Sequence, residues 1–360
     1  MLDVADVAGY LLRRKLLSPR AVVDGGLRVV DASRLNRVFL VTAQCGPSYV
    51  VKLAGAAGDA GVAHEAAVLS RLRSDPLAAH LPNVVSYDAT DRVLVLEAAP
   101  GARDLVRHHR RGRFSVALAR EAGRALAQLH ATPRGALDGI PSPPHPTTST
   151  PVHRLDLDTM RTLSAAAVEL IRILQSFDDL CAALDGVQAS WREDSLVHGD
   201  VRWDNCIVWR RPDADRWTQL QLIDWELAGV GDPGIDVGSF LAEYLLAWVQ
   251  SVPISDPQDP GRLLPYAGLP LRRMRPAVRA FWQAYARRRG SSVAELHATL
   301  QRSMHYTGVR LLGAALEEAQ VLSELQASVL SLLSLSHNIV CRPRDAADLL
   351  GLPDAWATAS

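Results

Sequence analysis

The sequence VHGDVRWDNCIVW, residues 197–209, places several polar side chains between two apolar, strand-like runs. These side chains are His198, Asp200, Asp204 and Asn205. They must lie beside the protein core, where an unpaired carboxylate is energetically costly. Either the fold or a ligand must therefore supply their partners.

The spacing H-x-D-x-x-x-x-N within this stretch is typical of a phosphoryl-transfer loop. In such a loop the aspartate orients the attacking hydroxyl and accepts its proton, and the asparagine binds Mg²⁺ through its amide oxygen. Asp200 and Asn205 are the candidates for these two roles. Asp224 is a second candidate metal ligand. It ends the apolar run LQLID, 19 positions after Asn205, and its carboxylate offers the oxygen ligands that magnesium prefers. Together these residues predict phosphoryl transfer.

A candidate phosphate-binding lysine lies far upstream of this loop. Lys52 stands in the alternating run YVVKL, on the face opposite its apolar neighbours. Glu65 lies on the apolar face of the next helical pattern, where a carboxylate needs a partner. Lys15 and Lys52 are the only lysines in a sequence rich in arginine. An ion pair between Lys52 and Glu65 is therefore expected, and it would hold the lysine against nucleotide phosphates.

The distribution of apolar residues predicts an α+β protein with two lobes. Strand-like runs occupy residues 27–54 and 83–98, and a helical pattern occupies residues 61–73 between them. We therefore expect a small lobe over residues 1–98, with an antiparallel sheet and one helix, that binds the nucleotide. Residues 99–360 are mostly helix-prone and are expected to form a large helical lobe, in which CIVW and LQLID form a hairpin.

The bulk composition favours a cytoplasmic protein without nucleic-acid or membrane partners. Basic and acidic residues balance at 39 each in the 360-residue chain, so no charge excess favours either partner. The four cysteines form no CxxC pair, which fits a reducing compartment. The N-terminus lacks the basic start and apolar core of a secretory signal, and the apolar stretch at 328–340 is too short to span a bilayer.

Four stretches of the chain resemble the aminoglycoside phosphotransferase and choline kinase-like family, a branch of the protein kinase fold. VHGDVRWDNCIV (197–208) resembles the catalytic loop of that family, and LIDWELAGVGDPGIDVG (222–238) resembles its magnesium-loop segment. LVLEAAPG (94–101) is similar to the hinge that receives adenine, and LAQLH (126–130) to a recurrent helix end. The resemblance covers about residues 27–245 and implies a two-lobed kinase-like fold with ATP between the lobes.

The resemblance assigns a role to each residue already singled out. It implies that Asp200 is the catalytic base and that Asn205 and Asp224 hold Mg²⁺. It also implies that Lys52 binds the α- and β-phosphates of ATP while paired with Glu65.

The same resemblance assigns four further residues. Glu97 and Ala99 belong to the adenine-binding hinge, and His198 and Asp236 brace the two loops without taking part in the chemistry. Asp204 stands where the family often has a small residue, and we expect it to be a solvated or loop-capping carboxylate.

The expected nucleotide loop departs from the glycine-rich loop of protein kinases. VVDASRLNRVF (29–39) contains no glycine. Ser33 and Asn36 offer side-chain hydrogen bonds to phosphate, and Arg34 or Arg37 adds positive charge. Related small-molecule kinases tolerate such loops, so we expect ATP binding with an affinity that is weaker or that depends on a partner.

The phosphate acceptor is predicted from a second resemblance. VVDASRLNRVFLVTAQCGPSYVVK (29–52) resembles the phosphotransferase subunits of class V lanthipeptide and thioamitide biosynthesis. Those subunits phosphorylate Ser or Thr of a ribosomally made precursor peptide, and a separate lyase partner then eliminates the phosphate. A kinase of polycationic aminoglycosides is expected to gather carboxylates at the rim of its substrate site. The C-terminal part of this chain instead contains arginine clusters at 272–276 and 286–290.

Two alternatives remain open: a kinase of aminoglycosides or other small molecules, and a catalytically weak, kinase-like scaffold for a partner enzyme. The chain contains all four residues that a kinase needs, Lys52, Asp200, Asn205 and Asp224, which argues against the scaffold. The segment 321–340 is expected to be buried in the helical lobe and not to form a docking surface. A two-metal hydrolase is disfavoured because it assigns no role to Lys52 or Glu65.

Overall fold

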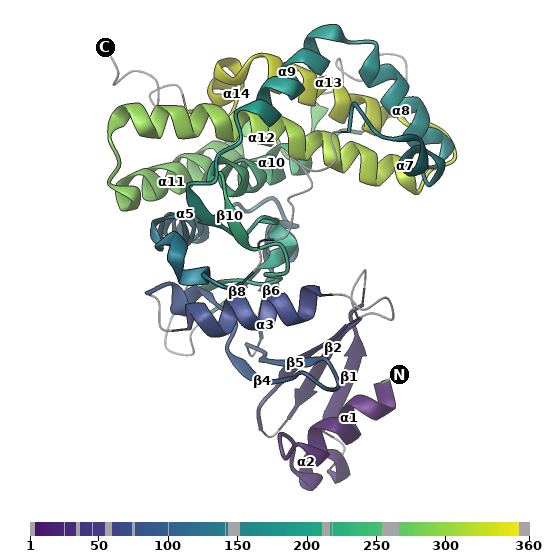
Figure 1. Ribbon diagram of the computed structural model, residues 1–360, viewed down its shortest axis with the longest axis vertical. Helices are drawn as coiled ribbons and strands as arrows, with labels where there is room; N and C mark the ends of the chain where they lie inside the picture. Colours follow the sequence, from purple (N-terminus) through teal and green to yellow (C-terminus); the bar gives the residue numbers. More distant parts are fainter. Residues whose placement is uncertain are drawn as a thin grey trace.

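The computed structural model describes residues 4–24, 26–33, 37–44, 46–54, 60–73, 76–99, 101–140, 142, 152–210, 217, 219–253 and 266–352. Figure 1 shows a sheet and short helices at the N-terminal end, and a larger, mostly helical part above them. The predicted α+β, kinase-like fold class is confirmed by this arrangement.

Within those ranges, five antiparallel strands form the N-terminal sheet in the order β1-β2-β3-β5-β4. The strands are β1 (Leu27–Asp31), β2 (Arg37–Ala43), β3 (Tyr49–Leu53), β4 (Val84–Asp88) and β5 (Val93–Glu97). Because successive side chains of a strand point to opposite faces, Tyr49, Val51 and Leu53 of β3 enter one apolar cluster while Lys52 points to the other face. Helix α3 (Gly61–Leu72) lies on the Lys52 side and buries Glu65 there.

The opposite face of the sheet is covered by an N-terminal helix that the sequence prediction of one helix does not include. Helix α1 (Val4–Arg13) buries Val7, Tyr10 and Leu11, which recur at i, i+3 and i+4, in the same cluster as Val51. Helix α2 (Pro19–Val23) follows it. The lobe therefore contains two α-helices besides α3 in its described part, because the outer face of the sheet also needs an apolar cover.

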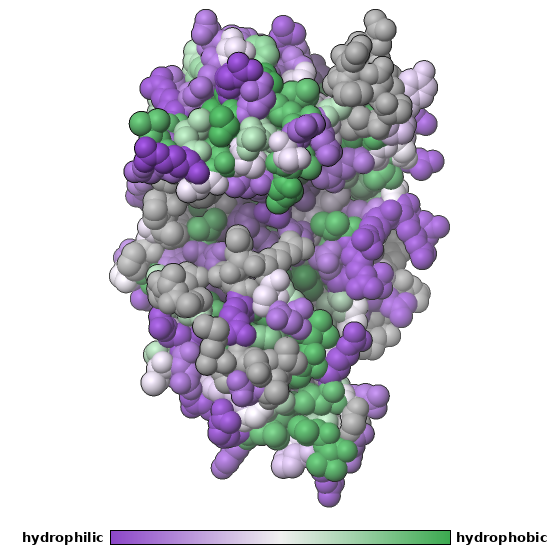
Figure 2. Space-filling view, turned by 90° about the vertical axis from the view of Figure 1, so that its right-hand side faces the viewer, coloured by the Kyte–Doolittle hydropathy of each residue, from purple (hydrophilic) through white to green (hydrophobic). Residues whose placement is uncertain are grey.

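Figure 2 shows apolar side chains gathered at the lower end of the molecule, where α1 and α2 lie in Figure 1. Val23 of α2 is 81% exposed there. Polar and apolar side chains are interspersed over the helical part on the same face.

The rest of the described chain forms helices and two small sheets. The helices are α4 (Leu105–His109), α5 (Val116–Ala131), α7 (Leu157–Arg161), α8 (Ala165–Gln175), α9 (Asp178–Ala189), α10 (Gly234–Gln250), α11 (Leu271–Arg289), α12 (Val293–Gln320), α13 (Ala327–Cys341) and α14 (Pro343–Leu349). The strands are β6 (Arg103–Asp104), β7 (Ser195–Val197), β8 (Cys206–Trp209), β9 (Gln219–Leu222) and β10 (Gly229–Gly231). Short 3₁₀ helices cover Pro76–His80, Arg134–Leu137 and Trp203–Asn205.

The small sheets hold both ends of the loop at residues 198–205. Strand β7, which precedes the loop, pairs with β10, so that Val197 lies opposite Gly229. Strand β8, which follows the loop, pairs with β9, so that Cys206 lies opposite Leu222. The predicted hairpin of CIVW and LQLID is confirmed, and it brings the loop beside the end of β9.

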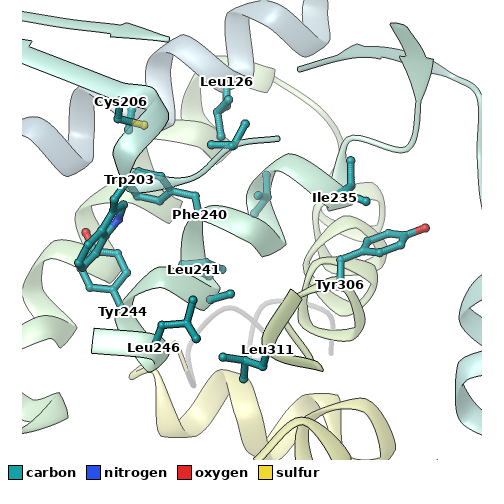
Figure 3. Close-up of a cluster of buried hydrophobic side chains, with 14 of the residues drawn as sticks. Leu126, Trp203, Cys206, Ile235, Phe240, Leu241, Tyr244, Leu246, Tyr306 and Leu311 are labelled. Atoms are coloured by element: carbon teal, nitrogen blue, oxygen red, sulfur yellow. The ribbon is translucent and has the colours of Figure 1, made fainter. Parts of the chain in front are cut away.

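Close packing of long helices forms the core of the helical part. Figure 3 shows a cluster of buried aromatic and aliphatic side chains around Phe240 and Tyr244 of α10. Helices α10 and α12 approach so closely that a Cβ at Gly238 would lie 2.4 Å from the carbonyl oxygen of Ser303. Helix α13 is buried along one face, including Val329 and Leu332. The burial predicted for 321–340 therefore holds for the helix, but residues 321–326 before it are exposed or half-buried, with Val321 83% exposed. Among the described residues, no helix is both long and apolar enough to cross a membrane.

Candidate functional site

Lys52 lies at the centre of a buried ion cluster. Its Nζ donates to Oε2 of Glu65 at 2.7 Å, to Oε1 at 2.9 Å, and to Oδ1 of Asp224 at 2.8 Å. The side chains of Lys52 and Glu65 are almost fully buried, whereas the Asp224 side chain is 31% exposed. Burial by itself lowers the pKa of Lys52, but the two carboxylates outweigh burial and raise this pKa above its usual value. The predicted Lys52–Glu65 ion pair is confirmed, and Asp224 joins it.

Asp224 follows β9 in a left-handed backbone conformation. Its φ is 71°, which costs a non-glycine residue about 1–2 kcal/mol. The neighbouring Ile223 holds this turn, because its N–H donates to the carbonyl oxygen of Asn205 at 2.9 Å. The left-handed conformation directs the Asp224 carboxylate toward Lys52, and the surrounding contacts maintain it against the strain. Strained backbone of this kind is common at functional sites.

Gly199 occupies a position where no other residue fits. Its φ is 82°, and a Cβ there would lie 2.6 Å from the carbonyl oxygen of Leu227. Its amide donates to Oδ1 of Asp236 at 2.9 Å, and the amide of His198 donates to Oδ2 at 2.8 Å. One carboxylate at the start of α10 therefore fixes the backbone immediately before Asp200.

Asp236 is itself held by a histidine that the sequence prediction did not include. Nε2 of His130 donates to Oδ2 of Asp236 at 3.1 Å, and Oη of Tyr285 lies 2.9 Å from Nδ1. Asp236 and His130 are fully buried, and burial alone raises the pKa of Asp236. The hydrogen bond from His130 and the backbone amides outweigh burial and lower this pKa. His130 is the last residue of LAQLH (126–130). That stretch is similar to a recurrent helix end of the family, but the similarity by itself assigned no role to the histidine.

His198 connects the loop to the end of β9. Its Nε2 donates to the carbonyl oxygen of Ile223 at 3.0 Å, and its Nδ1 accepts from the amide of Asp200 at 3.3 Å. The ring is fully buried. These contacts hold Asp200 close to Asp224, which follows Ile223.

Asp200 and Asn205 are hydrogen-bonded to each other across the loop. Nδ2 of Asn205 donates to Oδ2 of Asp200 at 2.8 Å and to its carbonyl oxygen at 2.9 Å. Burial raises the pKa of Asp200, the charge of Asp224 adds to this effect, and Arg202 and Arg310 oppose it. A raised pKa makes Asp200 a stronger proton acceptor than a solvated aspartate.

The oxygen atoms around this pair fit a magnesium ion. Lys52 contacts Oδ1 of Asp224, and the amide nitrogen of Asn205 is directed at Asp200. Oδ2 of Asp224 and Oδ1 of Asn205 are therefore the atoms that a cation would contact. A carboxylate oxygen and an amide oxygen are ligands that Mg²⁺ prefers.

The residues expected to contact the rest of ATP make local hydrogen bonds within the described ranges. Oγ of Ser33 accepts from the amide of Val38 at 3.1 Å. At the end of β5, the Glu97 carboxylate accepts from Nδ2 of Asn83 at 2.9 Å, and the carbonyl oxygen of Ala99 accepts from the amide of Ala102. Asn36 and Arg34 lie outside the described residues. Strand β5 pairs with β3, which carries Lys52, so Glu97 is the last residue of the neighbouring strand and Ala99 follows it closely.

Asp204 is paired within the loop. Its carboxylate accepts from Nε of Arg202 at 3.2 Å and from a terminal nitrogen of the same guanidinium at 3.1 Å. Both side chains line a cavity of about 620 Å³ between α4, the loop, α10, α12 and α13. The loop residues that line it are Arg202, Trp203 and Asp204, which follow Asp200 in the chain.

Apart from Asp204, the sequence prediction assigned no role to the residues that line this cavity. Glu243, His109 and Trp203 are buried there, and Arg310 is mostly buried. No spacing rule singles them out, because they come from α10, α4, the loop and α12. His109 lies in RHHRRGR, and in that segment the arginines are exposed while this histidine is buried.

Substitution of Lys52 by arginine should lower kcat/KM for ATP by about 100-fold. A guanidinium fork is too large for a slot in which two carboxylates lie within 2.9 Å of one ammonium group. Steady-state kinetics with varied ATP measures the change. Lys15→Arg, at the exposed second lysine of the chain, is the matched control. Equal kinetics in the two variants would contradict this role of Lys52.

Substitution of Glu243 by glutamine should remove a pH dependence of stability. Burial raises the pKa of Glu243 to about 7 from its usual 4.5, so the folded state binds more protons than the unfolded state between these values. The stabilisation that Glu243 contributes is complete below pH 4.5 and is lost as the pH rises through 7. The free energy of unfolding falls by about 3 kcal/mol in total over this range. Urea unfolding at pH 5 and pH 8 should show Glu243→Gln gaining stability over the unsubstituted protein only at pH 8. An equal difference at both pH values would contradict the expected titration.

Comparison with known proteins gives a family match and fold relatives. A family model described as the phosphotransferase enzyme family (APH) matches residues 26–290. A choline/ethanolamine kinase family protein from Mesorhizobium loti is 16% identical over 98% of this chain and 100% of its own, with a TM-score of 0.52. Choline kinase from Cryptosporidium parvum Iowa II is 12% identical over 98% and 99%, with a TM-score of 0.55. No curated protein matched in the sequence search. At these identities the two structures support the fold alone.

Proposed function

The chain belongs to the phosphotransferase enzyme family, and from this premise we propose that it phosphorylates Ser or Thr of a ribosomally made precursor peptide. The family makes it an ATP-dependent phosphotransferase that acts on a hydroxyl group. In the proposal, phosphorylation is the first step of dehydration, and a separate lyase partner eliminates the phosphate. We further propose a cytoplasmic location, and a division into a nucleotide-binding lobe over 1–98 and a catalytic lobe over 99–360.

The joint placement of two residue pairs carries the proposal of phosphoryl transfer. Asp200 lies 2.8 Å from Asn205, and Asp224 lies 2.8 Å from Lys52. The charge of Asp224 is also close enough to Asp200 to contribute to its raised pKa, after burial. A proton acceptor, two oxygen ligands and a fixed cation therefore share one site, which is the set that phosphoryl transfer needs.

In the proposed reaction, Asp200 accepts the proton of the acceptor hydroxyl. The hydroxyl oxygen forms a bond to the γ-phosphorus, while the bond from this phosphorus to the β–γ bridging oxygen breaks and ADP leaves. Lys52, held by Glu65, binds the α- and β-phosphates. Asn205 and Asp224 would hold Mg²⁺, which would neutralise charge on the phosphate oxygens when bound.

The remaining assignments concern binding and support. We propose that Ser33 and Asn36 bind phosphate and that Glu97 and Ala99 bind adenine. His198 and Asp236 position Asp200 through the backbone and β9 contacts described above.

Two observations support a peptide as the acceptor. The segment 29–52 resembles subunits that act on precursor peptides. The carboxylate of Asp204, four positions after Asp200, is also already paired with Arg202, which weakens its attraction for a polycation. A small-molecule kinase is the second candidate, because the cavity lined by Arg202, Trp203 and Asp204, at about 620 Å³, has the size of a small-ligand site.

Incubation with γ-labelled ATP and Mg²⁺ tests the proposal. The acceptors are a Ser/Thr-rich precursor peptide and a panel of aminoglycosides, and the Asp200→Asn variant is the negative control. We expect label on the peptide and none on the aminoglycosides. Label only on an aminoglycoside would establish the small-molecule alternative. ATP binding without transfer to any acceptor would favour the scaffold role.

A further inference from the structure

Helix α10 carries two buried carboxylates on the face that meets the loop 198–205. Asp236 and Glu243 are the only charged residues of this helix, and they are 0% and 8% exposed. They are seven residues apart, which is two helical turns, so both side chains leave the helix on the same side, about 10 Å apart along its axis. A buried carboxylate is costly unless it accepts hydrogen bonds, so each of the two needs donors from a neighbouring segment.

The loop supplies these donors on both sides of Asp200. Asp236 accepts the backbone amides of the two residues that precede Asp200, at 2.8 and 2.9 Å. Oε2 of Glu243 accepts the backbone amide of Trp203 at 3.1 Å. Two side chains of one helix therefore hold the loop backbone immediately before Asp200 and again three residues after it.

Trp203 is the first residue of the short turn that carries Asn205. This turn is the 3₁₀ helix Trp203–Asn205, and the amide of Asn205 donates to the carbonyl oxygen of Arg202 at 3.1 Å. The Asn205 side chain in turn donates to Oδ2 of Asp200 at 2.8 Å. A displacement of Trp203 therefore moves a proposed metal ligand and, with it, the partner of the proposed base.

The side chain of Trp203 is held at the same place on α10 as its backbone. Its ring packs edge-to-face on Tyr244, the residue after Glu243, with ring centroids 4.8 Å apart at 90° (Figure 3). The Trp203 residue is 3% exposed. Consecutive residues of α10 thus fix the amide and the ring of one loop residue.

We propose that Glu243 is a positioning residue for phosphoryl transfer, whose carboxylate fixes the start of the turn that presents Asn205 and thereby holds Asp200 in place. This inference rests on the proposed function, which gives Asn205 and Asp200 their roles. Glu243 acts through the loop backbone, and it extends to the far side of Asp200 the support that Asp236 gives before it.

A purely structural role for Glu243 would be to balance neighbouring charges. Arg310 of α12 and Arg202 of the loop attract its carboxylate, and Asp204 repels it. Charge balance needs a negative charge at this position, whereas positioning of the loop needs an oxygen that accepts the Trp203 amide. The two roles therefore differ in what an uncharged substitution does.

The test compares two uncharged variants of similar size. Glu243→Gln keeps an amide oxygen that accepts a hydrogen bond, and Glu243→Met offers only a weakly accepting thioether. We expect Glu243→Met to lower kcat for transfer to a Ser/Thr-rich precursor peptide by about 10- to 100-fold, with much less change in KM for ATP, because small displacements of reacting groups are costly. Glu243→Gln should retain most of the rate. Equal losses in the two variants would establish charge balance and overturn the proposal.

Glu324→Met is the matched control, because it makes the same change at an exposed glutamate. Glu243→Leu is the second variant without an oxygen acceptor, and it should act in the same direction as Glu243→Met. Thermal unfolding of all four variants establishes which of them are folded.

Hydrogen exchange of the Trp203 amide gives a measurement that does not depend on activity. Loss of its acceptor should speed exchange about tenfold in Glu243→Met and leave it nearly unchanged in Glu243→Gln. If exchange follows this pattern but the unsubstituted protein phosphorylates no acceptor, the proposed function fails and the anchoring of the loop by Glu243 stands. If the amide exchanges alike in the two variants, or if Glu243→Met transfers phosphate as fast as Glu324→Met, the positioning role is overturned and the proposed function is unaffected.

Discussion

Substitution of Asp200 by asparagine is expected to lower kcat for acceptor phosphorylation by about 1,000-fold or more. The variant keeps the shape of the side chain and removes the proton acceptor that the acceptor hydroxyl requires. General base catalysis contributes about 10²- to 10⁴-fold, and phosphoryl transfer depends on positioning and charge for most of the remainder. Single-turnover transfer of labelled phosphate measures the loss.

The pH profile provides a second measure of the same role. Burial, together with the charge of Asp224, raises the pKa of Asp200 above its usual 3.8. A base acts when deprotonated, so kcat/KM should rise with pH through this raised pKa. Asp200→Asn should lose this acidic limb.

The control for Asp200 is Asp158→Asn, an exposed residue that pairs only with Arg161 in the hydrogen bonds described for it. It should retain full activity, and both variants should unfold at similar temperatures. Transfer at the original rate in a folded Asp200→Asn protein would rule out Asp200 as the base.

Substitution of Asp224 by alanine is expected to abolish magnesium-dependent ATP binding and to lower the transfer rate by about 1,000-fold. The change removes one of two proposed metal ligands and one of the two carboxylates that hold Lys52. Loss of a single charge-stabilising group at a reacting centre costs about 10²- to 10³-fold, and here two such functions are lost together. Nucleotide titration with and without Mg²⁺ measures the binding effect.

A left-handed backbone at Asp224 makes this variant informative in a second way. Its φ of 71° strains any residue with a Cβ, so alanine does not relieve the strain. Asp224→Asn keeps the side-chain shape and one oxygen, and it should fall between alanine and the unsubstituted protein. Asp91→Asn, in the exposed turn before β5, is the control for overall fold. ATP binding that is equal with and without Mg²⁺ in the unsubstituted protein would contradict the metal role of Asp224.

Local spacing was sufficient to predict the fold class and the loop. The alternation in YVVKL placed Lys52 on the face opposite Val51, and the structure shows the same separation, because strand geometry depends only on neighbours along the chain. The hairpin of CIVW and LQLID was likewise predicted from two apolar runs. Helix α1 was not predicted, because its apolar face can be recognised as a packing surface only once the sheet that it covers is known.

The sequence by itself singled out the candidates for phosphoryl transfer from their types and spacings: Lys52, Asp200, Asn205 and Asp224. Tertiary structure alone decided which of them touch. Lys52 meets Asp224 from 172 positions away, and His130 meets Asp236 from 106 positions away. The cavity beside residues 202–204 is lined from α4, the loop, α10, α12 and α13, which lie far apart in the sequence. The physical reason is that hydrogen-bond satisfaction and burial are properties of packed neighbours in space, which spacing along the chain does not encode.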